Sequence, residues 1–289
     1  MRTIRKPEEL TKALDKLRAQ GKCVGFVPTM GALHEGHLSL VRAANRENDI
    51  SVVSIFVNPT QFGPQEDYTK YPRVLGADRK KLRTVGADYL FCPSTAAMYP
   101  EGFNKPLKFA GAKWPRLARG LCAKFRPGHF QGVVTVVTKL LRITGACRLY
   151  LGAKDCQQAA VIGQLIRDLG LDVRVRVMPT VREKDGLAMS SRNRYLSADE
   201  RRRALTISRT LFRLRRDLQR NAGTVAGLRA RAFHELKKDM DRVQYLEVVD
   251  AETLHPARRR GRKRVALAAC FVGKTRLIDN VIIPPSRIP

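Results

Sequence analysis

The stretch "CVGFVPTMGALHEGH", residues 23–37, joins an apolar run to a turn that holds two histidines three positions apart. The chain has only five histidines, so their crowding at one turn is notable. The apolar run is unbroken, as in a strand buried on both faces of a parallel sheet. Gly31 permits a tight turn, and a helix is expected to begin around Gly36. We therefore expect His34 and His37 to point the same way across a helix N-terminus.

A helix N-terminus carries unpaired backbone N–H groups and the positive end of the helix dipole, so it favours phosphate. Two imidazoles at this place can donate hydrogen bonds to a phosphorus centre that gains negative charge. The alternative is that both histidines only pack or cap within a loop. The pattern H-x-G-H directly after a strand favours the phosphate interpretation.

The first two thirds of the chain alternate between apolar β-branched runs and helix-patterned stretches, which predicts an α/β fold with a parallel sheet covered on both faces. At the N-terminus we expect a strand and then a helix that starts at Pro7. The further strands are expected in residues 23–28, 49–58, 87–93, 147–152 and 171–180. The helices between them are expected in residues 36–48, 74–86, 132–144 and 156–170.

The rhythm changes after about residue 183, where a long charged helical region spans roughly 199–239 and is broken near "NAGT". Strand-like stretches follow at 244–254, 264–272 and 275–283. This order of elements predicts a second, smaller α+β domain. We therefore divide the chain into residues 1–183 and residues 184–289.

The formal net charge of +29 suggests an anionic partner, but it is spread along the chain. After residue 198 there are 22 Lys/Arg against 10 Asp/Glu, which is +12 of the total. The dense cluster "RRRGRKR", residues 258–264, lies between two strand-like stretches and is expected to be an exposed hairpin loop. A solvated basic face is the simpler interpretation, and an anionic surface or polymer is the alternative. We expect no sequence-specific recognition of nucleic acid.

The six cysteines are scattered and form no C-x-x-C pair. We expect reduced thiols, several of them buried, and no metal ligands among them. No apolar run approaches the roughly 18 residues of a membrane-spanning helix. The basic start of the chain is not followed by the apolar stretch of a secretory signal. These features predict a cytoplasmic protein without a membrane partner.

Other loops carry polar groups suited to phosphates and small acids. In "MSSRN", residues 189–193, Ser190 and Ser191 can donate to phosphate oxygens, and Arg192 can neutralise them. With H-x-G-H upstream, this stretch looks like the second signature of the nucleotidyltransferase superfamily. In "FVNPTQF", residues 56–62, the amides of Asn58 and Gln61 could bind a hydroxy acid, although a simple Asn-Pro turn is the alternative.

The stretch "LGAKDCQQ", residues 151–158, also ends a strand. Lys154 can reach phosphates, Asp155 can accept hydrogen bonds from ribose or ammonium, and Gln158 lies one turn into the next helix. The stretch "RPGHF", residues 126–130, adds a cation and a histidine at a turn.

Together, "PTMGALHEGH", "FVNPTQF", "RPGHFQGVVTVVTKLL", "GAKDCQQAAVI" and "PTVREKDGLAMSSRNRYLS" resemble the pantothenate synthetase (pantoate–β-alanine ligase) family in order and spacing over nearly the whole chain. The resemblance implies a Rossmann-like N-terminal domain, a smaller C-terminal domain, a homodimer, and ATP used with Mg²⁺. It implies that pantoate attacks the α-phosphorus of ATP to give pantoyl adenylate and pyrophosphate. β-Alanine would then attack the activated acyl carbon, releasing pantothenate and AMP, as part of coenzyme A biosynthesis.

The same resemblance implies roles for individual residues, with His37 as the proton donor beside His34. Lys154, Ser190, Ser191 and Arg192 would stabilise the transition state at the α-phosphorus. Gln61 and Gln158 would hold pantoate, with Gln61 also bordering β-alanine, and Arg126 and His129 would lie near that second substrate. The implied ATP contacts are Met30, Gly31, Ala32, Leu33, His34, Glu35, Gly36, His37, Gly152, Ala153, Lys154, Asp155, Val181, Met189, Ser190, Ser191 and Arg192.

Two positions depart from the family pattern, because Ala153 stands where a Glu is usual and Cys156 where an aromatic residue is usual. Losing the Glu removes a carboxylate beside the implied nucleotide site. One alternative is a nucleotidyltransferase that adenylates a phosphate ester, and "FVNPTQF" and "KDCQQ" argue against it. Another is a nucleic-acid-binding protein on an old enzyme fold, but the basic clusters show no recognition motif.

Overall fold

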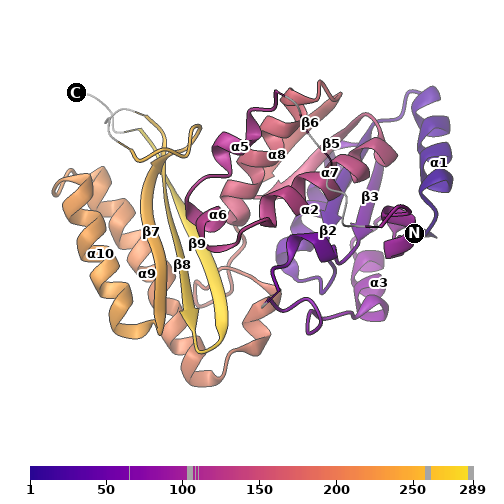
Figure 1. Cartoon of the computed structure of the whole chain (residues 1–289). Helices are drawn as coiled ribbons and strands as arrows, with labels where there is room; N and C mark the ends of the chain where they lie inside the picture. The colour runs from indigo at the N-terminus through magenta and orange to yellow at the C-terminus, as the bar shows by residue number, and fades with distance from the viewer. Residues whose placement is uncertain (65, 103–106, 108, 110, 258–261, 286–289) are drawn as a thin grey trace. The chain divides into compact units, whose positions relative to one another are not determined.

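The computed structural model describes residues 1–289 except 65, 103–106, 108, 110, 258–261 and 286–289 (Figure 1). The chain divides into two compact units. The first comprises Met1–Ala153 and Gln158–Pro179, and the second comprises Lys154–Gln157 and Thr180–Pro289. This division falls close to residue 183, where the sequence pattern changes. It also groups four residues that follow the fifth strand with the second unit, which the pattern did not indicate.

The first unit is built on a six-stranded sheet with the order β1-β4-β3-β2-β5-β6, and its paired strands are parallel. The parallel sheet predicted from the unbroken apolar runs is thus confirmed. The strands are β1 (Arg2–Ile4), β2 (Val24–Thr29), β3 (Ile50–Ile55), β4 (Tyr89–Phe91), β5 (Cys147–Gly152) and β6 (Val173–Met178).

The order of the strands reverses beside β2. From β2 the chain proceeds to β3 and then β4 on one side, and it returns to place β5 and β6 on the other side. Ligands of open parallel sheets bind beyond the carboxyl ends of the strands at such a switch point. The loops that follow β2, β3 and β5 are therefore where the fold itself predicts a site.

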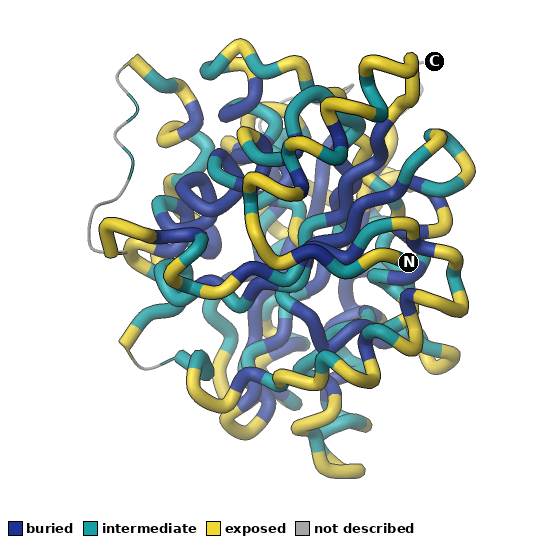
Figure 2. The backbone as a smooth tube through the Cα atoms, turned by 90° about the vertical axis from the view of Figure 1, so that its right-hand side faces the viewer, coloured by how far each residue is buried: buried dark blue, intermediate teal, exposed yellow. Residues whose placement is uncertain are grey.

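The expected long helices of the first unit are all present. They are α1 (Pro7–Ala19), α2 (Glu35–Glu47), α3 (Leu75–Thr84), α7 (His129–Thr144) and α8 (Cys156–Asp168). Three short helices were not expected, because four or five residues are too few to show a helical period. These are α4 (Thr95–Met98), α5 (Trp114–Leu117) and α6 (Leu121–Phe125). Figure 2 shows the buried stretches in dark blue and the exposed loops and helix faces in yellow.

The second unit pairs two helices with an antiparallel sheet of order β7-β8-β9, as Figure 1 shows. Its elements are α9 (Ala198–Gln219), α10 (Val225–Asp239), β7 (Arg242–Asp250), β8 (Arg264–Val272) and β9 (Thr275–Ile283). A capping box starts α9, where Ser197 and Glu200 each accept from the other's backbone N–H. One apolar cluster joins both helices to the sheet. The smaller α+β domain is thus confirmed.

The basic cluster at residues 258–264 is only partly as predicted. Residues 258–261 lie outside the described part of the chain. Arg262 is exposed, but Arg264 is the first residue of the central strand β8 and is only 2% exposed. The expectation that Arg264 belongs to an exposed loop is therefore wrong, because its backbone pairs with both Asp250 and Ile283. The strand expected at 264–272, which includes Arg264, is confirmed as β8.

All six cysteines are free thiols, as expected, and Cys23 is exposed. Burial raises the pKa of Cys92 and of Cys156 to about 11. Burial likewise raises the pKa of Cys147 and of Cys270 to about 12. These four side chains therefore remain protonated at neutral pH.

Within the described residues, no helix combines the length and the apolar composition that crossing a membrane requires.

Candidate functional site

The turn after β2 is built by two successive residues in the left-handed region. Gly31 has φ +81° and Ala32 has φ +51°. A Cβ on Gly31 would meet Ile55 Cγ2 at 3.0 Å, so glycine serves both the conformation and the close packing. The Gly31 N–H donates to Thr29 Oγ1 at 3.1 Å. The turn predicted from Gly31 is thus present, and it delivers the chain to the start of α2.

His34 is the N-cap of α2, and His37 occupies its third position. The His34 N–H donates to His37 Nδ1 at 3.3 Å, and the two ring centroids lie 4.1 Å apart. Because Nδ1 of His37 accepts this bond, the neutral ring carries its proton on Nε2. The two imidazoles thus lie together at a helix N-terminus, as the spacing predicted, where an N–H donor suits a phosphate oxygen.

The loop after β3 brings Asn58 and Gln61 together. Asn58 is 1% exposed, and its amide donates to Gln61 Oε1 and to the Gly132 carbonyl, each at 3.2 Å. Its Oδ1 accepts from the Tyr99 hydroxyl at 2.7 Å. Asn58 therefore holds the Gln61 side chain in place and is itself engaged by protein groups.

Gln61 also links two loops of the predicted site. Its Nε2 lies 2.9 Å from Met30 Sδ, so the loop after β3 contacts the loop after β2. The backbone of η1 (Pro59–Gln61) lies directly against α7 at Gly132. A Cβ on Gly132 would stand 2.2 Å from the Thr60 carbonyl oxygen, so only glycine allows this approach.

Arg126 and His129, predicted near the second substrate, lie beside Gln61. The guanidinium of Arg126 binds both carboxylate oxygens of Glu66 at 2.6 Å, and its Nη1 lies 2.9 Å from His129 Nε2. His129 Nδ1 lies 2.8 Å from the Gln61 carbonyl oxygen. Burial raises the pKa of Glu66, but the hydrogen bonds and charge of Arg126 outweigh burial and lower it overall. Sequence reasoning missed Glu66, which carries no motif of its own.

The stretch after β5 divides between the units. Gln158 lies in the first turn of α8 and belongs to the first unit, whereas Lys154 and Asp155 belong to the second. Lys154 Nζ lies 3.9 Å from Asp155 Oδ2, and its side chain is 19% exposed. The Lys154 carbonyl accepts from Asn280 Nδ2 at 2.9 Å, so β9 holds this stretch within the second unit.

In the second unit, the predicted ATP contacts Val181 and Met189 are neighbours. The Met189 N–H donates to the Val181 carbonyl at 3.0 Å, next to the β-bridge between Arg182 and Ala188. The signature residues Ser190, Ser191 and Arg192 follow directly. Ser190 is the N-cap of η3 (Ser191–Tyr195), and its Oγ accepts from the Arg192 N–H at 3.3 Å.

Sequence reasoning also missed the pair that anchors this loop. Arg182 binds Asp279 with two hydrogen bonds of 2.7 and 2.8 Å and donates to the Asn280 carbonyl at 3.2 Å. Burial raises the pKa of Asp279, although Arg182 opposes the shift. The available signal was "RLIDNVII", where a carboxylate interrupts an apolar strand and so requires a buried partner. Two consecutive residues of β9 therefore contact both stretches: Asp279 binds Arg182 of the hairpin, and Asn280 binds the Lys154 carbonyl.

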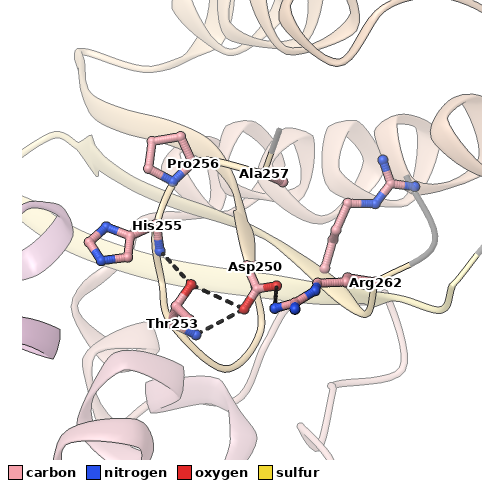
Figure 3. A pocket seen from close by; sticks show the side chains of 7 residues that line it. Asp250, Thr253, His255, Pro256, Ala257 and Arg262 are labelled. Atoms are coloured by element: carbon pink, nitrogen blue, oxygen red, sulfur yellow. Dashed lines mark hydrogen bonds and ion pairs between the residues drawn. The ribbon is translucent and has the colours of Figure 1, made fainter. Parts of the chain in front are cut away.

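A pocket of about 470 Å³ lies elsewhere in the second unit (Figure 3). It contains none of the predicted site residues. Asp250 in its wall accepts from the N–H and the Oγ1 of Thr253, and these backbone and side-chain bonds lower the pKa of Asp250. Arg262 lies 3.8 Å from the same carboxylate. The polar groups of this pocket therefore stabilise a turn. Its lining comprises Asp250, Thr253, His255, Pro256, Ala257, Arg262 and Arg264.

The described residues contain no group of three or more His, Cys, Asp or Glu side chains that could hold a metal ion. A magnesium ion needs oxygen ligands and keeps several waters, and it is commonly carried by substrate phosphates.

Comparison with known proteins gives consistent results for the whole chain. Residues 2–282 match a family described as pantoate-beta-alanine ligase. The pantothenate synthetase of Thermotoga neapolitana is 48% identical over 285 residues, covering 98% of this chain and 100% of the relative. That of Thermosipho africanus is 47% identical over 283 residues, covering 98% of this chain and 100% of the relative.

Solved structures agree with the sequence relatives. The crystal structure of pantothenate synthetase from Thermus thermophilus superposes with a TM-score of 0.89 at 44% identity, covering 99% of this chain and 100% of that chain. A pantoate-beta-alanine ligase from Francisella tularensis, complexed with β-γ ATP and β-alanine, has a TM-score of 0.79 at 36% identity. This second alignment covers 98% of the present chain and 97% of that chain.

Proposed function

Because the chain belongs to the pantoate–β-alanine ligase family, we propose a residue-level mechanism for the reaction of that family. The enzyme joins pantoate to β-alanine with the use of ATP, in pantothenate biosynthesis. The two alternatives, a nucleotidyltransferase acting on a phosphate ester and a nucleic-acid-binding protein on an old fold, have no support from the relatives.

The reaction proceeds in two steps. A pantoate carboxylate oxygen forms a bond to the α-phosphorus of ATP, and the bond from that phosphorus to pyrophosphate breaks. The β-alanine amine then attacks the acyl carbon of the adenylate, AMP leaves, and the amine loses a proton. Adenylation is needed because a carboxylate by itself offers no adequate leaving group.

One observation carries the assignment of the phosphate site: His34 and His37 lie together at the N-terminus of α2, directly beyond the central strand β2. His37, with its Nε2 proton, donates to an oxygen on the α-phosphorus as negative charge builds there. His34, the neighbouring imidazole, donates a second hydrogen bond at the phosphates. The turn Met30–Leu33 and the first residues of α2 lie along the nucleotide.

Lys154, Ser190, Ser191 and Arg192 supply positive charge and hydrogen-bond donors to the phosphates. Gln61, oriented by Asn58, and Gln158 bind the carboxylate and hydroxyls of pantoate. Arg126 and His129 lie near the second substrate. The remaining contacts to ATP come from Gly152, Ala153, Asp155, Val181 and Met189.

Magnesium would be carried by the phosphates of ATP, where it would offset part of their negative charge. The family resemblance further supports a homodimer, which light scattering coupled to size-exclusion chromatography would test. The activity also supports a cytoplasmic location, where ATP is available, and a fluorescent fusion would test this.

The order of the steps is tested by ATP–pyrophosphate exchange. We expect exchange that depends on pantoate and proceeds without β-alanine, because adenylation is complete before the amine reacts. Pantothenate and AMP should form only when β-alanine is added. If pyrophosphate were released only when pantoate and β-alanine are both present, a separate adenylation step would be contradicted. If the exchange rate did not depend on pantoate, the substrate assignment would be contradicted.

A further inference from the structure

We propose that Asp78 is a positioning residue for the H-x-G-H turn and thereby for the adenylation step. Asp78 lies in the first turn of α3 and is 1% exposed. Its Oδ2 accepts from the Ala32 N–H and its Oδ1 from the Leu33 N–H, each at 2.8 Å. One buried carboxylate therefore binds two consecutive backbone donors of the turn that leads into His34.

The turn needs such a partner. Ala32 is a non-glycine residue at φ +51°, a left-handed conformation in which its Cβ is crowded by the backbone. Ala32 and Leu33 are both buried, so their N–H groups have no access to bulk water. Successive N–H groups in left-handed turns form an anion-binding concavity, and here the anion is a side chain of the same chain. Asp78 thus stabilises a conformation that the backbone would otherwise avoid.

A second residue of α3 holds the same turn. Lys81, one turn beyond Asp78, donates from Nζ to the Leu33 carbonyl at 2.5 Å. The N–H and the carbonyl of Leu33 are therefore both bound by α3, one by a carboxylate and the other by an ammonium group. The residue after Leu33 is His34, the N-cap of α2. The position of the imidazoles is consequently set by α3 as well as by α2.

This inference rests on the proposed role of His34 and His37, and it predicts that one step of the reaction is affected more than the other. A misplacement of about 1 Å in catalytic groups can cost about 100-fold in rate. The histidines act at the phosphorus in the first step, whereas the second step is an attack at the acyl carbon. Loosening the turn should therefore slow adenylation far more than aminolysis of preformed pantoyl adenylate.

The test compares Asp78→Asn with Asp88→Asn. The control residue Asp88 also binds a backbone donor, the Ser51 N–H at 2.8 Å, but at the beginning of β3. Asparagine keeps the shape of each side chain and replaces one acceptor oxygen with a donor. We expect Asp78→Asn to slow pantoate-dependent ATP–pyrophosphate exchange about 10- to 100-fold per folded molecule. In the same Asp78→Asn variant, the rate of single-turnover aminolysis should change by less than about threefold. The control Asp88→Asn should change the melting temperature but neither of the two rates.

Lys81→Met provides a second variant if Asp78→Asn does not fold, because Lys81 is an exposed residue. It should slow exchange in the same selective way, by a smaller factor. If Asp78→Asn and Lys81→Met both leave exchange unchanged, or if they slow exchange and aminolysis equally, the positioning role is wrong. A wild-type enzyme without pantoate-dependent exchange would instead contradict the proposed function, so the two failures are distinguishable.

Discussion

At the scale of single residues, some features of the candidate site could be predicted from the sequence and others could not. The spacing of His34 and His37 was enough to predict that they share a helix N-terminus, because residues three apart lie on one helix face. The engagement of Asn58 by Tyr99 and Gly132 could not be predicted, since those partners are distant in sequence. Asp78 was hidden for the same reason: its carboxylate meets a turn more than forty residues earlier in the chain.

The role of His37 leads to a first prediction. Replacing His37 with Ala should lower kcat by about 100-fold or more, because it removes a donor to the developing charge at phosphorus. The melting temperature should change little, since the ring is only half-buried. Steady-state kinetics and a thermal melt measure both.

His234→Ala is the matched control, because His234 is exposed on α10. Its kcat should equal that of the wild type. If His37→Ala melts normally and turns over normally, the imidazole has no part in the chemistry.

Elements were predicted better than their contacts. The unbroken apolar runs predicted the strands of the parallel sheet, and the period of 3.6 predicted the long helices. The approach of η1 to α7 was not visible, because a single glycine inside a helix carries no such signal. The short helices α4, α5 and α6 were also missed, since each is shorter than the repeat needed to recognise it.

The contact between α7 and η1 gives a second prediction. Gly132→Ala should destabilise the protein by about 1–3 kcal/mol, because its Cβ would overlap the Thr60 carbonyl. The helix or the loop must move, which displaces Gln61 and should raise the KM for pantoate more than that for ATP. Chemical denaturation and kinetics measure the two effects.

The chain offers a close control for this variant in Gly163, which also lies inside a helix. A Cβ on Gly163 would meet no atom nearer than 3.9 Å. Gly163→Ala should therefore be neutral or stabilise by up to about 1 kcal/mol. Equal destabilisation by both substitutions would show that helix propensity, and not the contact with Thr60, is the cause.

The ion pair between Glu66 and Arg126 predicts a pH dependence. Arg126 lowers the pKa of Glu66 in the folded protein below its ordinary value of 4.5. The stability from this pair is thus present above that value and is lost as pH falls through the folded pKa. The difference in melting temperature between wild type and Glu66→Gln should be largest near neutral pH and should shrink as the pH falls below 4.5. A difference that grows on acidification would contradict this sign.

At the scale of the whole molecule, the sequence predicted the two-part architecture and the reaction class, but it offered no reason for the net charge. Part of the excess positive charge is arranged regularly along α9. Four exposed arginines on α9 and one at its C-cap recur at intervals of seven, four, three and four residues, which is one helix face. They are Arg202, Arg209, Arg213, Arg216 and Arg220. Acidic neighbours lie beside three of them, namely Arg202, Arg213 and Arg216.

This face leads to a prediction about polyanions. Binding to RNA or DNA of any sequence should weaken steeply between about 50 and 200 mM salt, as expected for cations that displace counterions. Arg209→Gln with Arg220→Gln should reduce the salt slope by roughly 1.5 to 2 and leave ligase turnover unchanged. Fluorescence anisotropy with two unrelated oligonucleotides measures both. A complex that prefers one sequence and resists salt would show instead that the charge serves specific recognition.

The distribution of the thiols makes this enzyme convenient for spectroscopy. Cys23 is the exposed thiol, Cys122 is buried, and burial keeps the other four thiols protonated at neutral pH, namely Cys92, Cys147, Cys156 and Cys270. A maleimide dye at about pH 7 should therefore attach once per native chain, because the thiolate is the reacting form. Mass spectrometry would count the dyes. The wild-type protein thus carries its own labelling handle directly before β2, the strand that leads to the two histidines.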